Sequence, residues 1–167
     1  AVTAGAEDSM DQMWGDSTVK RIDTSDRVAL FREGNYGMFM HWGLYSHLGG
    51  KWEGETFYGI GEWIKRQMKI PEAEYMGLGS QFNPADFDAK EIVRVAKQAG
   101  MKWIIITSKH HDGFAMFKSA HPFNIVDATP FKRDPMRELA AACREEGLGF
   151  GFGGKKREAK AQNQDHH

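Results

Sequence analysis

Histidines follow two apolar stretches of the chain, at the points where a strand would end. His41 comes directly after the run that starts at Tyr36, and His110 and His111 come after residues 101–108. An imidazole donates or accepts hydrogen bonds near neutral pH, and it also binds metal ions. In parallel α/β folds, ligands bind beyond the carboxyl ends of the strands. The three histidines are therefore predicted to line one polar ligand site.

Aromatic side chains and carboxylates are frequent near these histidines. Aromatic rings stack on the apolar face of pyranose sugars and recur in ligand pockets. The aromatic candidates are Trp42, Tyr45, Trp52, Phe57, Tyr58, Trp63 and Phe114. The carboxylate candidates are Glu53, Glu55, Glu62, Asp112 and Asp127. A glycosidase needs two carboxylates about 5 Å apart for retention or about 6.5–9.5 Å apart for inversion. Spacing in the sequence does not show which carboxylates converge, so these residues predict a sugar or polar-ligand site and leave its reaction open.

A metal site is the alternative use of the same residues, because His41, His110, His111 and Asp112 are all possible zinc ligands. Adjacent histidines on an extended strand point to opposite faces, however. The sequence has neither a His-x-His nor a His-Glu-x-x-His pattern. Its single cysteine, Cys143, excludes an internal disulfide and a multi-cysteine metal site, and its alanine-rich surroundings predict a buried side chain. We expect no metal ion and no cofactor, and a metal-dependent barrel hydrolase stays the alternative.

Strand and helix patterns alternate along the chain. Strands are predicted at 36–42, 101–108 and 148–152, helices at 26–33, 88–99 and 134–146, and helical turns at 62–69 and 72–78, beside a long loop at 46–61. The order strand–helix–strand–helix–strand predicts parallel strands with right-handed crossovers. The centre of the second strand is apolar on both faces, which predicts that both faces are covered. A (β/α)₈ barrel and a doubly wound sheet both begin this way. A full barrel needs about 250 residues, more than this chain has, and the pattern by itself leaves both folds open.

The two longer helices carry recognisable ends. For helix 88–99, Asp88 and Glu91 predict a capping box, and Gly100 ends the helix. For helix 134–146, Asp134 is the predicted N-cap, followed by a proline at the first helical position. The expected apolar faces are Ile92, Val93, Ala96 and Ala99 in the first helix, and Met136, Leu139, Ala140 and Cys143 in the second, which ends at Gly147.

Composition divides the chain into three parts and limits its partners. We expect an N-terminal arm (1–24), a packed α/β domain (25–152) and a polar, mobile tail (153–167). The net charge of −1 gives no footprint for nucleic acid and no polybasic membrane patch. No apolar run approaches the roughly 18 residues of a membrane span. Ala4-Gly5-Ala6 has the form of a signal-peptidase site, which favours an exported protein, periplasmic or extracellular; the alternative is an arm of small residues.

Four segments together resemble a known family. They are YGMFMHWGLYSHLGGKW (36–52), GEWIKRQMKIP (61–71), FNPADFDAKEIVRVAKQAGMKWIIITSKHHDGFAMF (82–117) and NIVDATPFKRDPMRELAAACREEGLGFGF (124–152). Their order and the HWG and KHHDGF motifs resemble the α-L-fucosidases of glycoside hydrolase family 29, over residues from about 10 to 152. The resemblance implies a (β/α)₈-like barrel, of which residues 25–152 would form a partial, truncated catalytic barrel. It also implies retaining, exo-acting removal of terminal L-fucose from glycoconjugates.

The resemblance also implies a set of substrate-binding residues, with no metal in the chemistry. The histidines and a glutamate would bind the sugar hydroxyls, and a tryptophan would stack on the ring: His41, Glu62, Trp63, His110 and His111. The family's nucleophile and acid/base lie on later strands, and the sequence departs from the family pattern after Phe152. This chain is therefore expected to supply the fucose-binding half without the two catalytic carboxylates. The alternative is a non-catalytic carbohydrate-binding fragment.

A partial barrel leaves strand edges unpaired, and such edges recruit further strands. The apolar residues of the first and third strands, such as Phe39 and Phe152, would lie at these edges. We therefore expect a homo-oligomer or a complementing chain that completes the barrel.

Overall fold

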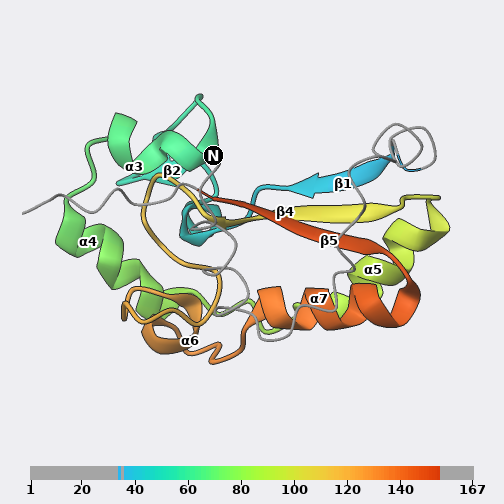
Figure 1. Ribbon diagram of the computed structural model, residues 1–167. Helices are drawn as coiled ribbons and strands as arrows, with labels where there is room; N and C mark the ends of the chain where they lie inside the picture. Colours follow the sequence, from blue (N-terminus) through green and yellow to red (C-terminus); the bar gives the residue numbers. More distant parts are fainter. Residues whose placement is uncertain (1–33, 35, 155–167) are drawn as a thin grey trace, which may run out of the picture. The chain divides into compact units, whose positions relative to one another are not determined.

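A three-stranded parallel sheet is the centre of the structure, a computed structural model that describes Gly34 and residues 36–154. The strands are β1 (Gly37–Met40), β4 (Trp103–Lys109) and β5 (Gly149–Gly154), in the order β1-β4-β5 (Figure 1). All of them belong to the compact unit that begins at Tyr36. The predicted arm at 1–24, the predicted helix at 26–33 and the tail from residue 155 lie outside the described residues.

The register of the sheet confirms the predicted parallel order. Phe39 of β1 pairs with Ile105 of β4, and Ile105 pairs in turn with Gly151 of β5. A parallel ladder needs a long crossover between neighbouring strands, and here each crossover contains one of the two longer helices. β5 includes Gly153 and runs to Gly154, which lies beyond the predicted end of this strand at residue 152.

The helices α5 (Ala89–Gln98) and α7 (Pro135–Glu146) lie along the same side of the sheet (Figure 1). Ile104 and Ile106 of β4 are fully buried, as are Val93 and Ala96 of α5 and Met136, Leu139 and Cys143 of α7. Alternate strand residues point to opposite faces, so Ile105 and its neighbour Phe39 lie on the other side, where Phe39 is 58% exposed. The prediction that both faces of the second strand are covered is therefore wrong for the described residues.

Both helices begin and end with the expected residues, except in one detail. The Asp88 side chain accepts hydrogen bonds from the backbone N–H groups of Lys90 and Glu91, at 2.9 and 3.1 Å. Glu91 does not return the bond of a capping box, because its carboxylate binds Arg94 instead. Asp134 caps α7 through the backbone N–H of Arg137, at 3.0 Å. A cap of this kind stabilises a helix by about 1 kcal/mol.

The buried faces of these helices differ from the prediction at three positions: Ile92 is only half-buried, and two alanines are misplaced. Val93 and Ala96 are buried together with Ala89, whereas Ala99 is exposed in the last turn of α5. In α7, Ala142 is buried in place of the predicted Ala140. Both misplaced residues lie at the border of the apolar stripe, where helical spacing alone does not decide burial.

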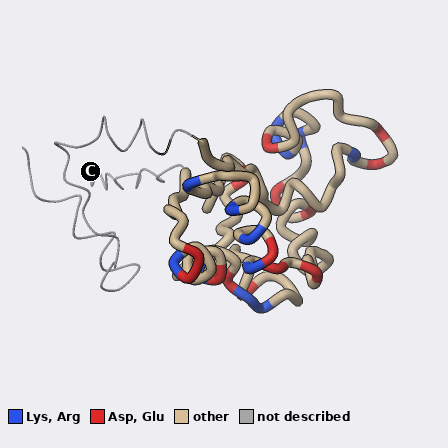
Figure 2. The backbone as a smooth tube through the Cα atoms, turned by 90° about the vertical axis from the view of Figure 1, so that its right-hand side faces the viewer, with Lys and Arg blue, Asp and Glu red and all other residues tan. Residues whose placement is uncertain are grey.

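Charged side chains cover the outer surface of the two helices. Lys97 of α5 pairs with Glu146 of α7 at 2.8 Å, and Lys90 pairs with Glu145 at 3.2 Å. Figure 2 shows acidic and basic residues interspersed over the described part of the chain. Exposed ion pairs of this kind contribute at most about 1 kcal/mol each, so the apolar contacts beneath them hold the helices in place.

The connection from β1 to α5 forms a group of short elements. They are η2 (Leu44–Leu48), the hairpin of β2 (Lys51–Trp52) and β3 (Glu55–Thr56), η3 (Gly61–Trp63), α3 (Ile64–Gln67), α4 (Glu72–Gly77) and η4 (Leu78–Gln81). In Figure 1, β2, α3 and α4 lie near the end of the sheet toward which the strands point. Leu44, Ile64 and Tyr75 are fully buried and anchor the group. The helical turns were predicted, whereas the hairpin was not.

The connection from β4 to α7 contains one short helix, α6 (Ile125–Ala128). Its N-cap is Asn124, whose side chain accepts hydrogen bonds from the backbone N–H groups of Val126 and Asp127. Among residues 36–154, no helix is both long and apolar enough to cross a lipid bilayer.

Candidate functional site

The three histidines converge at the carboxyl edge of the sheet. His41 follows β1, and His110 and His111 follow β4, the strand next to it. The ring centroids of His41 and His110 are 5.5 Å apart, and those of His110 and His111 are 4.6 Å apart with the ring planes at 81°. Because the two histidines after β4 sit on a turn and not on the strand itself, their rings do not point to opposite faces of the sheet.

Glu62 and Trp63 of η3 join the histidines from a distant part of the chain. The Glu62 Oε1 atom lies 3.8 Å from Nδ1 of His41. The Trp63 ring stacks on His111, with centroids 4.0 Å apart and planes at 29°. We call these five residues the histidine cluster: His41, Glu62, Trp63, His110 and His111. The side chain of His41 is 43% exposed and that of Glu62 is 14% exposed, so a ligand can reach the cluster from solvent.

The turn that carries two of the histidines is closed by a backbone hydrogen bond. The Gly113 N–H donates to the carbonyl oxygen of His110 at 3.2 Å. Gly113 has φ +82°, a left-handed conformation that glycine adopts at little cost. The turn thus places His110 and His111 side by side at the end of β4.

His110 is the least hydrated of the three rings. Its Nδ1 atom is buried and has no hydrogen-bond partner within the described part of the chain. Burial lowers the pKa of His110, and the neighbouring His111 lowers it further, while Glu62 opposes the shift. His110 is therefore neutral at pH 7. A neutral imidazole can donate from one ring nitrogen and accept at the other, which suits recognition of a hydroxyl group.

Tyr45 lies beside His110 beneath the cluster, with ring centroids 5.9 Å apart. Burial raises the pKa of Tyr45 to about 12, so its hydroxyl stays protonated. Thr107 is nearby, but its hydroxyl bonds to the backbone of Trp42, accepting at 3.2 Å and donating at 3.3 Å. The buried hydroxyl of Tyr45 has no geometrically good partner among residues 36–154. Tyr45 therefore packs under His110 as part of the floor of the site.

Only one of the candidate carboxylates, Glu62, is a member of the cluster. Glu53 and Glu55 lie exposed in and beside the β2–β3 hairpin. Asp127 binds Lys118 and Asn124 in the loop before α7. Asp112 is adjacent to the cluster but only 6% exposed. Among these candidates, Glu62 is thus the one accessible carboxylate in the cluster, and a glycosidase needs two.

The candidate aromatic residues divide into ligand-accessible and packing positions. Trp63 contacts the histidines directly. Trp42 instead stacks on Phe87, with centroids 5.1 Å apart, and Phe114 is 1% exposed in the core. Tyr58 is 96% exposed. Trp52 and Phe57 are half-buried in and beside the β2–β3 hairpin, and Trp63 is the ring in contact with two cluster histidines.

The four residues considered as zinc ligands do not form a metal site. Within the described residues, no group of three or more His, Cys, Asp and Glu side chains is arranged to hold a metal ion. Trp63 lies against His111, and Asp112 points its carboxylate to Tyr75 and not to the histidines. Cys143 is fully buried in α7, as predicted, and burial raises its pKa to about 11.

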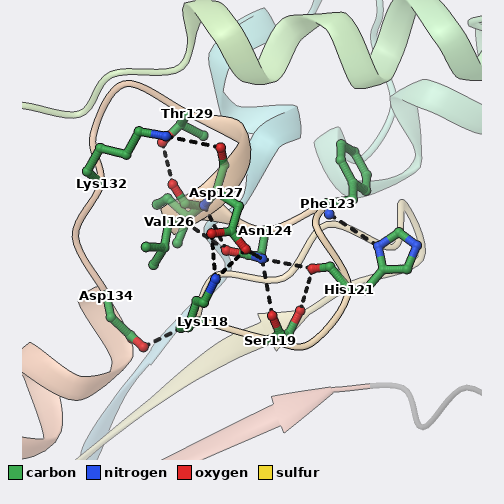
Figure 3. Close-up of polar contacts among 11 residues, drawn as sticks. Lys118, Ser119, His121, Phe123, Asn124, Val126, Asp127, Thr129, Lys132 and Asp134 are labelled. Carbon is green, nitrogen blue, oxygen red and sulfur yellow. Dashed lines mark hydrogen bonds and ion pairs between the residues drawn. The ribbon is translucent and has the colours of Figure 1, made fainter.

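A hydrogen-bonded loop follows the histidines (Figure 3). The side chain of Asn124 is fully buried and donates from Nδ2 to the carbonyl oxygen of His121 at 2.8 Å, while its Oδ1 caps α6. The backbone N–H of Met116 donates to the carbonyl oxygen of Ser108 at 2.8 Å and ties the loop back to β4. Both ends of the loop that starts at His110 are therefore fixed.

A groove of about 660 Å³ borders the cluster on this side. It shares His110 and His111 with the cluster and is completed by Glu72, Met76, Lys109, Asp112, Gly113, Ala115, Phe117, Ser119, His121 and Phe123. Most of these side chains are polar or charged, and Met76, Phe117 and Phe123 add apolar surface.

Sequence reasoning missed two residues that lie behind the cluster. Tyr75 of α4 and Lys65 of α3 both contact Asp112, through its carboxylate and its backbone carbonyl oxygen respectively. They were predicted only as parts of helical turns. Nothing in their local sequence marks them, because the contacts span 37 and 47 residues along the chain.

Comparison with known proteins identifies what this arrangement is similar to. The sequence matches the family "Alpha-L-fucosidase" over residues 4–166. It is 32% identical over 141 residues to plasma alpha-L-fucosidase of Rattus norvegicus, covering 77% of this chain and 30% of the relative. The human plasma alpha-L-fucosidase is 32% identical over 139 residues, covering 77% of this chain and 29% of the relative. The chain thus spans less than a third of the length of these curated relatives.

Solved structures agree with the sequence matches. An alpha-L-fucosidase from Lactobacillus casei in complex with alpha-L-fucose product is 51% identical, with a TM-score of 0.75 over 78% of this chain and 41% of that chain. The alpha-L-fucosidase from Vibrio sp. strain EJY3 is 44% identical, with a TM-score of 0.76 over 80% of this chain and 23% of that chain. A variant of the Lactobacillus enzyme was solved with 4-nitrophenyl-α-L-fucopyranoside as substrate. The fold is therefore part of a fucosidase-type catalytic barrel, as predicted.

Proposed function

The chain belongs to the alpha-L-fucosidase family, and on that premise we propose that it acts in the hydrolysis of terminal α-L-fucose from glycoconjugates by a retaining mechanism. Within that enzyme, the 167 residues provide the fucose-binding part. His41, Glu62, His110 and His111 bind the sugar hydroxyls, and Trp63 supplies an aromatic face. No metal or cofactor takes part.

The convergence of the histidine cluster supports this proposal most directly. Residues that follow β1, lie in η3 and form the turn after β4 come into contact: Glu62 lies 3.8 Å from His41, and the Trp63 and His111 ring centroids are 4.0 Å apart. A pyranose presents hydroxyl groups on its edge and an apolar face, and this set of side chains offers polar atoms and a ring for both. The neutral state of His110 lets it accept as well as donate.

We place the nucleophile and the acid/base outside these 167 residues. A retaining glycosidase needs two carboxylates about 5 Å apart. Glu62 is the accessible carboxylate at the cluster, and it already lies against His41. Asp112 is buried, and both of its oxygens already accept hydrogen bonds. The chain by itself therefore binds fucose without turning it over, and hydrolysis requires the remaining strands of a barrel, in the same or a second chain.

Binding and turnover are tested separately on the 167-residue chain. L-Fucose is titrated by calorimetry or NMR, with D-fucose, its mirror image, as the matched control ligand. We expect saturable binding of L-fucose and none of D-fucose. Equal responses to both sugars, or to neither, would contradict the proposed site. Turnover is measured with 4-nitrophenyl-α-L-fucopyranoside, for which we expect no release of nitrophenol above the blank. Release that is abolished by Asp112→Asn would show that the catalytic pair has been misplaced.

The proposed partners are a fucosylated glycan and a further protein surface. The relative from Lactobacillus casei has also been solved, as a variant, with Fuca(1,6)GlcNAc, so a core-type fucoside is a reasonable second ligand to titrate. The described sheet ends in β1 on one side and β5 on the other, and Phe39 is 58% exposed. We propose that a second copy or a complementing chain covers these positions.

A further inference from the structure

Asp112 follows the two cluster histidines and is buried beneath them. It is 6% exposed, and both carboxylate oxygens have partners. Oδ2 accepts a hydrogen bond from the hydroxyl of Tyr75 at 2.7 Å, and Oδ1 accepts one from the backbone N–H of Phe114 at 3.2 Å. Tyr75 is fully buried in α4, so the bond joins two elements inside the core.

Lys65 of α3 holds the same turn through its main chain. Its Nζ atom donates to the carbonyl oxygen of Asp112 at 3.2 Å and pairs with Glu72 of α4 at 2.7 Å. The ammonium group also lies 4.9 Å from the ring centroid of Tyr75. The turn from His110 to Gly113 is therefore fixed by α3 and α4 at both a side chain and a backbone carbonyl.

Burying a carboxylate costs free energy unless hydrogen bonds and opposite charges compensate the lost hydration. Burial raises the pKa of Asp112, against the hydrogen bonds from Tyr75 and Phe114 and the charges of Lys65 and His110. Burial and the nearby carboxylate also raise the pKa of Tyr75, so the phenol stays protonated and donates. Asp112 is buried, and its two oxygens point to Tyr75 and to the backbone of Phe114 and not toward solvent, so we infer that it acts through its neighbours.

We propose that Asp112, held by Tyr75 and Lys65, is a positioning residue that sets the orientation of His110 and His111 and so connects the α3–α4 segment to the ligand site. The alternative is that the buried bond only stabilises the fold. A positioning role predicts that the histidine rings move when the contacts of Asp112 are changed, whereas a purely stabilising role predicts that they do not. Asp112 is close enough to act in this way, because it is one residue from His111 and two from His110. The effect on fucose binding rests on the function proposed above, whereas the effect on the rings does not.

Ring positions in variants that keep the charge of Asp112 are the readout that a purely structural role would not move, and the charge itself gives a second readout. The groups that act on His110 are His111, Glu62, His41 and Asp112, and the charge of Asp112 favours its protonated form. Replacing Asp112 by asparagine removes this contribution. The pKa of His110 should therefore fall in Asp112→Asn, whereas Tyr75→Phe keeps the charge and changes only the geometry.

The experiment follows the ring C–H signals of the histidines by NMR during a pH titration of the sugar-free 167-residue chain. The variants are Asp112→Asn, Tyr75→Phe and Lys65→Met, with Asp86→Asn and Tyr58→Phe as controls at exposed positions. His110→Gln and His111→Gln assign the signals. We expect all three test variants to shift the signals of His110 and His111, and Asp112→Asn alone to lower the pKa of His110. The histidine signals of the two control variants should overlay on those of the unchanged chain.

Two results would overturn the positioning role. One is that the signals of both histidines in Tyr75→Phe and Lys65→Met overlay on those of the unchanged chain although stability falls. The other is an unchanged pKa of His110 in Asp112→Asn. If Asp112→Asn does not fold, the ring signals of Tyr75→Phe and Lys65→Met still distinguish a positioning role from a purely stabilising one. L-Fucose titration of the same samples adds the functional consequence, an affinity lower by about tenfold, as for one displaced hydrogen bond. Shifted rings with no fucose binding to the unchanged chain would contradict the proposed function and leave the positioning role intact.

Discussion

The indole ring of Trp63 stacks on the imidazole of His111, with ring centroids 4.0 Å apart and planes at 29°. The two residues are far apart in the sequence and come from different connections of the sheet. Trp63 also has the guanidinium group of Arg66 5.7 Å from its ring centre. The stack therefore fixes one wall of the histidine cluster.

Trp63→Ala should weaken L-fucose binding by about tenfold, because it removes the ring that stacks on His111, an aromatic pair worth about 0.5–1.5 kcal/mol. Trp63→Phe should recover part of the affinity, since it keeps a ring at this position. Calorimetric titration measures both. The matched control is Trp52→Ala in the β2–β3 hairpin, which should bind like the unchanged chain. Equal losses of L-fucose affinity in Trp63→Ala and Trp52→Ala would argue against a specific role of Trp63 in the site.

The fold and the position of the site could be predicted from the sequence to different degrees. The parallel order followed from Trp103–Ile106 and from caps such as Asp134, which are local signals. The convergence of His41 with His110 followed from one general rule, that parallel strands end at the same edge. The contacts of Tyr75 and Lys65 with Asp112 could not be predicted, since they depend on how α3 and α4 fold back over the turn.

The role of Glu62 and Trp63 came from the family resemblance and not from their pattern. Both lie in a short 3₁₀ segment, η3, whose position relative to β1 is set by the packing of Leu44 and Ile64. No periodicity marks such a segment. The error at β4 has a similar cause: an all-apolar strand predicts cover on both faces, but the sequence of the strand does not say which segment supplies the second cover.

Glu62→Gln should separate binding from stability. The Glu62–His41 contact is long at 3.8 Å, and the His41 side chain is 43% exposed, so its loss should change the free energy of unfolding by less than about 1 kcal/mol. The same change removes a charged acceptor from the sugar site, and L-fucose affinity should fall by about tenfold. Urea unfolding and fucose titration of one sample give both numbers. A large loss of stability with unchanged L-fucose affinity would mean that Glu62 stabilises the fold and does not bind the sugar.

The lowered pKa of His110 gives stability a defined pH dependence. Its folded-state pKa lies below the unfolded value of about 6.5, so the unfolded chain binds the proton more readily. The contribution of His110 to stability is therefore present above pH 6.5 and is lost as the pH falls from there through the folded-state pKa. We expect urea midpoints of the unchanged chain to drop more between pH 7.5 and 5.5 than those of His110→Gln. Parallel drops would show that His110 is not the group responsible. Asp112, with a raised pKa, changes stability in the opposite sense, so it does not mimic this effect.

Cys143 tests the packing of α7 against the sheet. The thiol is fully buried, its pKa is raised to about 11, and it is the only cysteine of the chain. Thiolate is the reactive form, so a disulfide reagent at pH 8 should modify the folded chain far more slowly than the unfolded chain. The modification rate in native buffer and in urea, read from the released chromophore, checks this. Rapid modification in native buffer would mean that α7 is not packed as described.

The last prediction concerns association. The face of the sheet opposite α5 and α7 carries Phe39, 58% exposed, and Trp103, 37% exposed, and β5 adds only glycines to it at positions 149, 151 and 153. In the described structure, β1 and β5 each lack a strand on one side. Unpaired strand edges beside exposed aromatic rings recruit further chains.

We therefore expect light scattering to show that the purified 167-residue chain is a dimer or a larger species. Phe39→Lys should shift the population toward monomer, because a charge in the middle of this face opposes its burial. Tyr58→Lys is the matched control, since Tyr58 is 96% exposed in a loop away from the sheet ladder, and it should leave the mass unchanged. L-Fucose binding measured on the same samples shows whether association completes the site: if a second chain contributes to it, affinity falls when Phe39→Lys becomes monomeric. A monomer at high concentration that unfolds cooperatively would contradict the prediction and would mean that another part of this same chain covers the face.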